Sequence, residues 1–305
     1  MLVSVVIPCY NVENYIAQCL QALLAQQYKD LQIICVNNNS TDNTLSILTR
    51  FATEHSSLIT LVEELQKGAP YARNRGLQEV QGEYVQFLDA DDLLEPEKIA
   101  HQVNLIKNNN FPDFIAANYY RESVEGNKKL HQVHRNDFWL GLLYTQLGIT
   151  SANIFKTSSV KSAGAFDVSL KSSQEYALMF SIMRLNGKVC SDARALTIVR
   201  DRKGGSITQQ NVAENLERYL HLRIRILKYL EENLDQSKMQ PYYQALFDAI
   251  RVLYKHNNVA SIKAFKENLP KSFKPSSSAA TTASYCILFR IFGFENTEKI
   301  KALLK

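Results

Sequence analysis

The sequence predicts an α/β fold in which a doubly wound, mainly parallel sheet is followed by a C-terminal helical appendage. Short apolar runs alternate with helical patterns through the first two thirds of the 305 residues, and long helical patterns follow from Val212 onward. Hydrophobic residues make up 46% and charged residues 21%, which is typical of a globular chain and excludes a disordered or fibrous one. We expect an α/β domain over residues 1–208 and a helical region over 209–305.

Buried strands and amphipathic helices alternate up to residue 88. The strand candidates are short, apolar and rich in β-branched residues, and the first of them ends at Pro8. The helix candidates repeat apolar residues every three or four positions, as at Ile16, Leu20 and Leu23. The expected strands are 4–7, 31–36, 59–62 and 84–88, and the expected helices are 14–26, 41–53 and 71–80. Such alternation predicts a ligand site beyond the carboxyl ends of the strands.

The later elements are predicted from helix breakers and from a change of pattern. A helix follows Pro96 and runs to Lys107, and residues 121–136 are polar and less regular. The remaining α/β elements are a strand at 114–119, an extended segment at 151–155 and a helix at 176–184. The helical region is expected to hold helices at 212–232, 241–256, 259–268 and 285–292, with a Lys/Pro/Ser/Thr-rich linker at 270–284.

The net charge of +5 is unevenly distributed along the chain. Residues 1–210 hold 20 Lys and Arg against 21 Asp and Glu, and residues 211–305 hold 15 against 9. A basic tail predicts either contact with an anionic surface or a solvated helical surface, and we favour the second. We expect no nucleic-acid partner.

The five cysteines indicate neither a disulfide framework nor a zinc site. They lie in apolar surroundings, without a CxxC pair or clustered histidines. The apolar start, Leu2 to Ile7, lacks a basic segment and is too short for a signal sequence or for a spanning helix of about 18 residues. We therefore expect a cytoplasmic protein, with peripheral contact at the inner face of the membrane as an open alternative.

The strongest local signal is a set of three carboxylates directly after an apolar strand, at Asp89, Asp91 and Asp92. Like charges at one strand end repel each other unless a cation lies among them, and carboxylate oxygens suit Mg²⁺ or Mn²⁺ beside a diphosphate. The alternative is a solvated turn or the cap of the helix that Pro96 begins. The two interpretations have about equal weight for this segment alone.

Two weaker signals follow other strands. Asn37 to Asp42 is a run of short polar residues that can hydrogen-bond the edge of a heterocycle, or can form an ordinary turn. Gly68 to Gly76 places Arg73 and Arg75 near a helix start, where they can face phosphates or form ion pairs on the helix.

Taken together, these segments resemble glycosyltransferase family 2. The resemblance covers about residues 3–208, and the combined set of motifs is highly specific. The segments that match the family pattern are Val5 to Asn11, Asn37 to Thr44, Ala72 to Leu77, Gly82 to Asp92 with its DxD motif, and Ala163 to Asp167.

The resemblance implies a GT-A fold, a nucleotide-diphosphate sugar donor, a divalent Mn or Mg ion and inversion at the anomeric carbon. It also implies roles for individual residues. Glu175 is the general base, and Asp91, assisted by Asp89, holds the metal. The implied donor-binding residues are Pro8, Tyr10, Asn11, Asn37, Asn38, Ser40, Arg73, Asp89 and Ala90. Arg73 is favoured over Arg75 as the phosphate partner, and Asp92 supports the metal site indirectly.

Two positions depart from the family pattern. The nucleotide turn usually carries adjacent aspartates, one of which accepts a hydrogen bond from uracil, whereas this chain has Asn37 and Asn38. An amide oxygen still accepts a hydrogen bond, so donor binding is expected to survive. The base position is usually Asp, and Glu175 keeps the carboxylate on a side chain longer by one methylene.

The expected function is metal-assisted transfer of a sugar, with a UDP-sugar as the favoured donor, to a hydroxyl of a glycan or lipid-linked acceptor. One alternative is a nucleotide-sugar binding or scaffold protein that has lost turnover, to which the substitutions at Asn37, Asn38 and Glu175 point. A sugar nucleotidyltransferase is less favoured, because no Gly-rich loop followed by Arg and Lys is found near the N-terminus.

Overall fold

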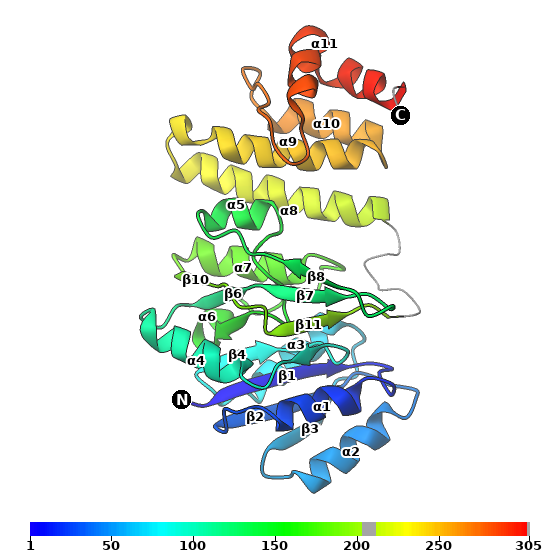
Figure 1. The fold of residues 1–305 in the computed structure, drawn as a ribbon, viewed down its shortest axis with the longest axis vertical. Helices are drawn as coiled ribbons and strands as arrows, with labels where there is room; N and C mark the ends of the chain where they lie inside the picture. Colours follow the sequence, from blue (N-terminus) through cyan, green and yellow to red (C-terminus); the bar gives the residue numbers. More distant parts are fainter. Residues whose placement is uncertain (203–211, 304–305) are drawn as a thin grey trace. The chain divides into compact units, whose positions relative to one another are not determined.

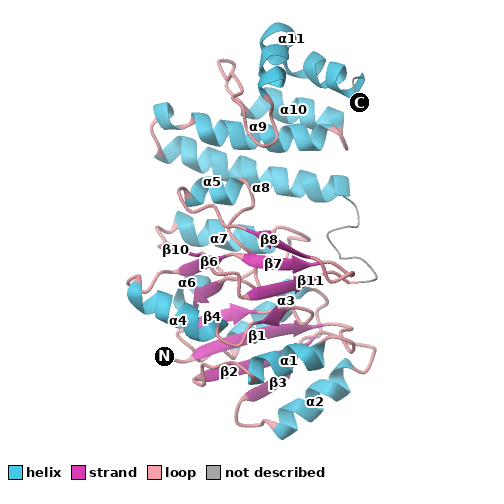
Figure 2. Ribbon diagram, viewed as in Figure 1, coloured by secondary structure: helices cyan, strands magenta, loops and turns pink. Residues whose placement is uncertain are grey.

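The computed structural model describes residues 1–202 and 212–303, which form two compact units. One unit comprises the described parts of 1–138 and 145–205, and the other comprises those of 139–144 and 206–305. The first is an α/β unit and the second is helical, as Figures 1 and 2 show. The expected boundary at residue 208 lies outside the described residues.

A seven-stranded sheet forms the centre of the α/β unit, in the order β10-β6-β9-β4-β1-β2-β3. Its strands are β1 (Val3–Cys9), β2 (Leu31–Asn37), β3 (Ile59–Glu63), β4 (Tyr84–Phe87), β6 (Phe114–Ala117), β9 (Ile154–Lys156) and β10 (Val189–Asp192). The pairs β1–β2, β1–β4, β2–β3 and β6–β10 are parallel. Only β9 runs antiparallel to its neighbours in this sheet. The prediction of a doubly wound, mainly parallel sheet is therefore confirmed.

Helices connect these strands and cover the sheet, whose central strands β1 and β2 are almost wholly buried. They are α1 (Ile16–Leu24), α2 (Thr44–Glu54), α3 (Ala69–Gln78), α4 (Lys98–Asn108), α6 (Thr157–Ser162) and α7 (Gln174–Arg184). The helix expected at 71–80 begins two residues earlier, because Gly68 takes a φ of 137° and Pro70 lies in the first turn of the helix.

The first strand does not end at Pro8 as predicted. β1 pairs with β2 through Cys9, whereas the residues that it pairs with β4 end at Val6. The backbone nitrogen of Pro8 faces the side where this second ladder has ended, so its missing N–H leaves no hydrogen bond unmade.

A second, four-stranded sheet has the order β5-β11-β7-β8. Its strands are β5 (Leu93–Leu94), β7 (Tyr119–Glu122), β8 (Lys128–His131) and β11 (Thr197–Arg200). The strand predicted at 114–119 divides at Asn118, whose buried side chain bonds the backbone of Val133 and Ala193. The less regular segment 121–136 contains a hairpin that the polar sequence did not indicate, because β8 is an edge strand whose side chains are mostly exposed.

The helical unit contains all of α5 (Phe138–Leu143) except its first residue, together with α8 (Val212–Asn233), η2 (Gln236–Lys238), α9 (Gln240–Tyr254), α10 (Asn258–Asn268) and α11 (Ala283–Leu303). Its core centres on Phe247, which is 0% exposed and contacts aromatic rings from α10, α11 and the loop before α11. The long helices predicted after residue 212 are confirmed. Throughout 1–202 and 212–303, no helix has both the length and the apolar character needed to cross a membrane.

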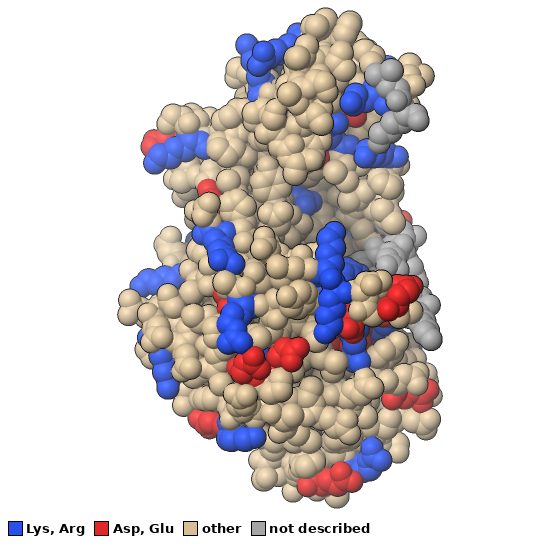
Figure 3. All heavy atoms as spheres, viewed as in Figure 1, with Lys and Arg blue, Asp and Glu red and all other residues tan. Residues whose placement is uncertain are grey.

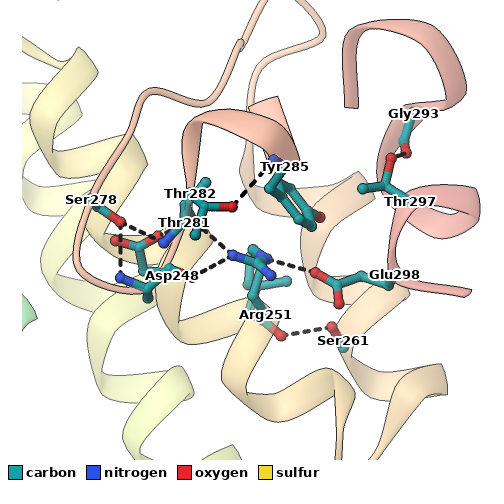
Figure 4. Close-up of polar contacts among 12 residues, drawn as sticks. Asp248, Arg251, Ser261, Ser278, Thr281, Thr282, Tyr285, Gly293, Thr297 and Glu298 are labelled. Carbon is teal, nitrogen blue, oxygen red and sulfur yellow. Dashed lines mark hydrogen bonds and ion pairs between the residues drawn. The ribbon is translucent and has the colours of Figure 1, made fainter. Parts of the chain in front are cut away.

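A buried polar network fixes the segment between α10 and α11 (Figure 4). Arg251 Nε donates to Glu298 Oε1 at 2.6 Å, and its Nη1 donates to Thr281 Oγ1 at 2.9 Å. Thr281 Oγ1 donates in turn to Asp248 Oδ1 at 2.6 Å. The guanidinium of Arg251 also lies 3.6 Å from the ring centre of Tyr285. The predicted linker is therefore a packed part of the helical unit.

The last helix packs through a different face from the one its sequence suggests. Ile287, Leu288, Ile291 and Phe292 recur at helical spacing, a pattern that predicts packing against the other helices of this region, but Ile287 is 59% exposed and Ile291 67% exposed. Tyr285 and Cys286 are buried instead. The helix also continues beyond residue 292, with a kink at Gly293 where φ is 71°.

Candidate active site

The acidic turn after β4 is held by backbone hydrogen bonds. Leu88 N donates to Val6 O at 2.9 Å, Asp89 N donates to Ser151 Oγ at 3.1 Å, and Asp92 N donates to Asp89 O at 3.0 Å. Ala90 is 2% exposed, which leaves little space at this point of the turn. The turn thus presents Asp89 and Asp91 from a fixed backbone at the carboxyl end of the sheet.

Arg73 of α3 connects this turn to the helix that carries the predicted base. Its Nη2 donates to Asp89 Oδ1 at 2.7 Å, and its Nη1 donates to Gln174 Oε1 at 2.9 Å. The Arg73 side chain is 8% exposed. Both outer nitrogens of the guanidinium are therefore engaged by protein groups in a largely buried position.

The segment around Phe166 packs against Arg73 and bonds the neighbouring residue Asn74. Asn74 Nδ2 donates to Phe166 O at 2.8 Å, and Phe166 N donates to Asn74 Oδ1 at 3.0 Å. The Arg73 guanidinium lies 5.3 Å from the centre of the Phe166 ring, which meets Phe87 edge-on at 4.8 Å. Three segments that match the family pattern thus form one packed group.

Glu175 lies in the first turn of α7, one residue after Gln174. A carboxylate at the start of a helix can also serve as its N-cap, but the N-cap of this helix is Ser173, with φ 62°, and Glu175 lies inside the helix. Burial raises the pKa of Glu175; the charge of Asp89 acts in the same direction, and the Arg73 guanidinium and a backbone N–H oppose it. A carboxyl with a raised pKa is a better proton acceptor once ionised.

Asp91 forms a short ion pair with Arg202, which follows β11. The preceding arginine of the same strand end, Arg200, donates through Nε to the Asp91 carbonyl oxygen and through its backbone N to Asp92 Oδ1 at 3.2 Å. Asp92 is 3% exposed, and burial raises its pKa well above the usual value, with the charges of Asp89 and Asp91 adding to the effect.

The asparagine turn after β2 is shaped by its own side chains. Asn38 Nδ2 donates to the carbonyls of Glu64 and Gln66, and Asn38 Oδ1 accepts from Gly68 N at 2.8 Å. The Asn38 amide therefore organises the loop that leads into α3. Asn37 is 6% exposed, and its Oδ1 accepts from Ser40 N at 3.4 Å.

The end of β1 meets this turn. Asn11, with φ 49°, accepts a hydrogen bond from Thr41 N at 2.8 Å, and its own N donates to Ser40 Oγ at 3.3 Å. Pro8 is partly buried in β1, and Tyr10 is 50% exposed. Pro8, Tyr10 and Asn11 thus lie at the carboxyl end of β1, beside the turn that follows β2.

The donor set at the acidic turn fits a divalent cation that completes its shell with substrate oxygens. Asp89 and Asp91 offer hard oxygen atoms, and Mg²⁺ is commonly bound by one or two protein carboxylates together with phosphates and water. Within the described ranges, no group of three or more His, Cys, Asp or Glu side chains is arranged to hold a metal by protein atoms alone.

The sequence interpretation missed Arg200, Arg202 and Tyr119. Arg200 is the last residue of β11 and Arg202 lies two residues after it. Their guanidinium groups lie over the Tyr15 ring, 5.5 and 5.4 Å from its centre. Burial raises the pKa of Tyr119 in β7; the Arg121 charge opposes this effect, and the charges of Glu175 and Asp92 add to it. A usable signal was present in the sequence. Two arginines follow the apolar Ile198 and Val199, just as the aspartates follow the apolar residues of β4, and their charges are opposite.

Comparison with solved structures defines the class of fold. TarS 1-349 of S. aureus, in complex with UDP-GlcNAc, matches with a TM-score of 0.66 at 20% identity, over 89% of this chain and 77% of that one. The mannosyltransferase PcManGT from Pyrobaculum calidifontis, in complex with GDP-Man and Mn²⁺, matches with a TM-score of 0.58 at 18% identity, over 99% and 86%. The fold is that of the GT-A glycosyltransferases.

Comparison of sequences defines the family. The profile described as "Glycosyl transferase family 2" matches residues 4–166. An uncharacterised glycosyltransferase of Rickettsia typhi, RT0329, is 30% identical over 264 residues, which are 84% of this chain and 80% of that protein. The poly(ribitol-phosphate) beta-glucosyltransferase of Bacillus spizizenii is 36% identical over 112 residues, or 36% of this chain and 18% of that one. The chain belongs to glycosyl transferase family 2.

Proposed function

We propose that the protein moves a sugar, with inversion, from a nucleotide diphosphate to a hydroxyl of a glycan or lipid-linked acceptor. The observation that supports this most directly is the bridge made by Arg73 between Asp89 and Gln174. It ties the acidic turn to the first turn of α7, where Glu175 lies. A diphosphate bound at the acidic turn and a proton acceptor at Glu175 would thereby be held on one framework, as an in-line displacement requires.

The proposed donor is a UDP-sugar. TarS 1-349 is described with UDP-GlcNAc and with UDP, whereas PcManGT is described with GDP-Man. Uracil and guanine are therefore the two nucleobases to be tested. Pro8, Tyr10, Asn11, Asn37 and Ser40 would line the nucleoside. The Asn38 amide is used by backbone groups and would act by shaping the loop.

A divalent Mn or Mg ion is proposed at Asp91 and Asp89. When bound, such an ion supplies Lewis-acid neutralisation of the departing diphosphate. Arg73 would hold the Asp89 carboxylate oriented toward the donor, and the buried Asp92 would support the turn.

Glu175 is proposed as the general base. It would take the proton of the acceptor hydroxyl while that oxygen bonds to the anomeric carbon, and the bond from this carbon to the diphosphate oxygen would break. The nucleoside diphosphate leaves with the bonding electrons. The raised pKa of Glu175, due first to burial, supports this role because it favours proton uptake during the reaction.

A panel of UDP-, GDP- and dTDP-sugars tests the proposal. Thermal unfolding of the full chain is followed with each nucleotide sugar, with and without Mn²⁺, because a ligand that binds only the folded state raises the midpoint. Donors that stabilise are then offered acceptor oligosaccharides and water. Stabilisation by one nucleotide with transfer or hydrolysis supports the proposal; binding without turnover favours the scaffold alternative, and pyrophosphate release from a nucleoside triphosphate favours the nucleotidyltransferase.

We also propose that α11 contacts an anionic membrane surface, where a lipid-linked acceptor would be found. Ile287, Ile291 and Phe292 are 59%, 67% and 45% exposed, and the exposed Arg290 lies among them. On the face drawn in Figure 3, the part formed by α8 to α11 shows separate Lys and Arg side chains and some Asp and Glu side chains among largely uncharged surface. Apolar groups beside basic ones are typical of interfacial helices.

Vesicle co-sedimentation tests the membrane contact. Truncation at Ser284 would remove the buried Tyr285, so substitution of Ile287, Ile291 and Phe292 by Ser is the cleaner change. We expect salt-sensitive binding to anionic vesicles by the intact chain and none by the triple variant. No binding by the intact chain would exclude the contact.

A further inference from the structure

The end of β11 brings a cation to the proposed metal ligand. Arg202 Nε and Asp91 Oδ2 form a direct ion pair, with the Asp91 side chain 15% exposed and that of Arg202 35% exposed. The Arg202 guanidinium also lies over the ring of Tyr15, the residue before α1, at 5.4 Å from the ring centre. Asp91 is therefore occupied by a protein cation that is itself held in place.

The position of Arg202 follows from the second sheet. β11 pairs with β5 and β7, and Arg200 at its end donates through Nη1 to Gln18 Oε1 at 2.6 Å and through its backbone N to Asp92 Oδ1. These bonds anchor the strand end against the acidic turn. Arg202 is thus delivered to Asp91 by contacts that do not depend on a bound ligand.

The two carboxylates of the metal proposal each have an arginine partner. Asp89 pairs with Arg73 and Asp91 pairs with Arg202. Arg73 is 6% exposed as a residue and also bonds Gln174. Among the described residues, the direct contacts of the Arg202 guanidinium are with Asp91 and the face of the Tyr15 ring. Of the two arginines, Arg202 is the one whose displacement breaks fewer contacts.

We propose that Arg202 competes with the divalent cation for the Asp91 carboxylate, and that a nucleoside diphosphate relieves this competition. An ion alone must displace Arg202 and leave its charge without a partner. A diphosphate supplies oxygens both to the ion and to the displaced guanidinium, so the two ligands would bind together more tightly than separately. This inference rests on the proposed metal site at Asp91.

Mn²⁺ binding measured by the electron paramagnetic resonance signal of the free ion tests this without any turnover. The full-length wild type, Arg202→Met and Arg202→Gln are titrated with Mn²⁺, first without nucleotide and then with UDP. Arg121→Met is the matched control, because Arg121 pairs with Asp201 beside Arg202 and its loss removes an equal charge without freeing Asp91. Circular dichroism establishes that each variant is folded.

Without nucleotide, we expect Arg202→Met and Arg202→Gln to bind Mn²⁺ about tenfold more tightly than the wild type, and Arg121→Met to remain near the wild type. We also expect UDP to strengthen Mn²⁺ binding more in the wild type than in the Arg202 variants. If the folded Arg202 variants and the wild type bind Mn²⁺ with equal affinity, the proposed competition is wrong and the metal site is unaffected. The same conclusion follows if Arg121→Met gains as much Mn²⁺ affinity as the Arg202 variants do. Failure of the wild type to bind Mn²⁺ even with UDP would overturn the metal site together with the competition.

Discussion

Arg73 and Asp89 form a 2.7 Å ion pair in which the arginine side chain is 8% exposed and the aspartate side chain is 39% exposed. The arginine is the buried partner, and the carboxylate faces outward. This asymmetry assigns Arg73 to holding Asp89 from behind, whereas the sequence alone favoured it as a direct phosphate partner. The direct role remains a prediction, and the geometry adds a positioning role to it.

Replacement of Arg73 by Lys tests the positioning role. Lys retains the charge but cannot donate to Asp89 and Gln174 together, so we expect kcat/KM for sugar transfer to fall about tenfold or more. Arg75→Lys on the same helix is the control, because Arg75 pairs with Glu79 near the surface and should leave kcat/KM unchanged. Equal effects of the two substitutions would contradict the assignment.

Replacement of Glu175 by Gln preserves the shape of the side chain and removes the carboxylate that we propose as the proton acceptor. We expect donor affinity to be retained and transfer to fall about 100-fold or more. Since burial raises the pKa of Glu175, the wild-type rate should fall with decreasing pH through a midpoint above 4.5. Removing the Arg73 charge, as in Arg73→Met, should move that midpoint to still higher pH. Steady-state rates from pH 4 to 8 check both points, and unchanged turnover in Glu175→Gln would leave the base unassigned.

Replacement of Asp91 by Ala should abolish the metal-dependent part of donor binding. Calorimetric titration with UDP, with and without Mn²⁺, measures this directly. Asp235→Asn is a suitable control, because the Asp235 side chain is 80% exposed and lies in the helical unit. If Asp91→Ala still binds UDP more tightly in the presence of Mn²⁺, the ion is held elsewhere.

Lys98 predicts a pH dependence of stability. It is 1% exposed, its Nζ donates to the buried Gln86 Oε1, and burial lowers its pKa from 10.5 to about 7. Between pH 7 and 10.5 the unfolded chain therefore binds more protons at this site than the folded one. The free energy of unfolding should rise with pH by up to about 1.4 kcal/mol per pH unit from this group.

Urea denaturation of Lys98→Met at pH 7, 8 and 9 measures this contribution. The slope of unfolding free energy against pH should be smaller in this variant than in the wild type. Lys107→Met on the exposed side of the same helix should keep the wild-type slope. Identical slopes in all three proteins would show that Lys98 is ionised in the folded state.

We expect substitutions of two glutamates in α11, Glu298 and Glu295, to differ in their effect on stability. The Glu298 side chain is 6% exposed and pairs with Arg251, so Glu298→Gln should lower the free energy of unfolding by about 3–5 kcal/mol by leaving a buried charge unpaired. Glu295 pairs with Lys299 on the exposed face of α11, and Glu295→Gln should leave stability unchanged. Thermal unfolding of both variants checks this, and a similar loss in both would rule out a special role for the buried pair.

The parallel sheet could be predicted from the sequence because its strands are buried on both faces and read as continuous apolar runs. Ile33, Ile34 and Val36 of β2 are all 0% exposed, which is the burial that such a run indicates. The motifs of the site were found for a related reason, since each follows one of these strands. The second sheet could not be predicted in this way. In β8, Lys128 and Lys129 are exposed, and no apolar alternation marks the strand.

The contacts of the site depended on long-range packing, which sequence spacing does not reveal. Arg73 lies 16 residues from Asp89 but 101 residues from Gln174, and nothing local to either segment indicates that they meet. Arg202 lies 111 residues from Asp91 and follows β11 of the second sheet. The site residues that the sequence did not predict are those that pair with residues far away in the chain.

The antiparallel strand β9 has a consequence for how the protein forms during translation. Residues 154–156 lie between β4 and β6 and pair with both, so the two flanking parts of the seven-stranded sheet are joined only after this segment has left the ribosome. Until then, β4 and β6 each present an unpaired edge to other nascent chains. A translational pause or a premature stop before residue 154 would therefore yield an aggregation-prone fragment, whereas the appearance of residues 154–156 pairs the facing edges of β4 and β6 with β9 at once.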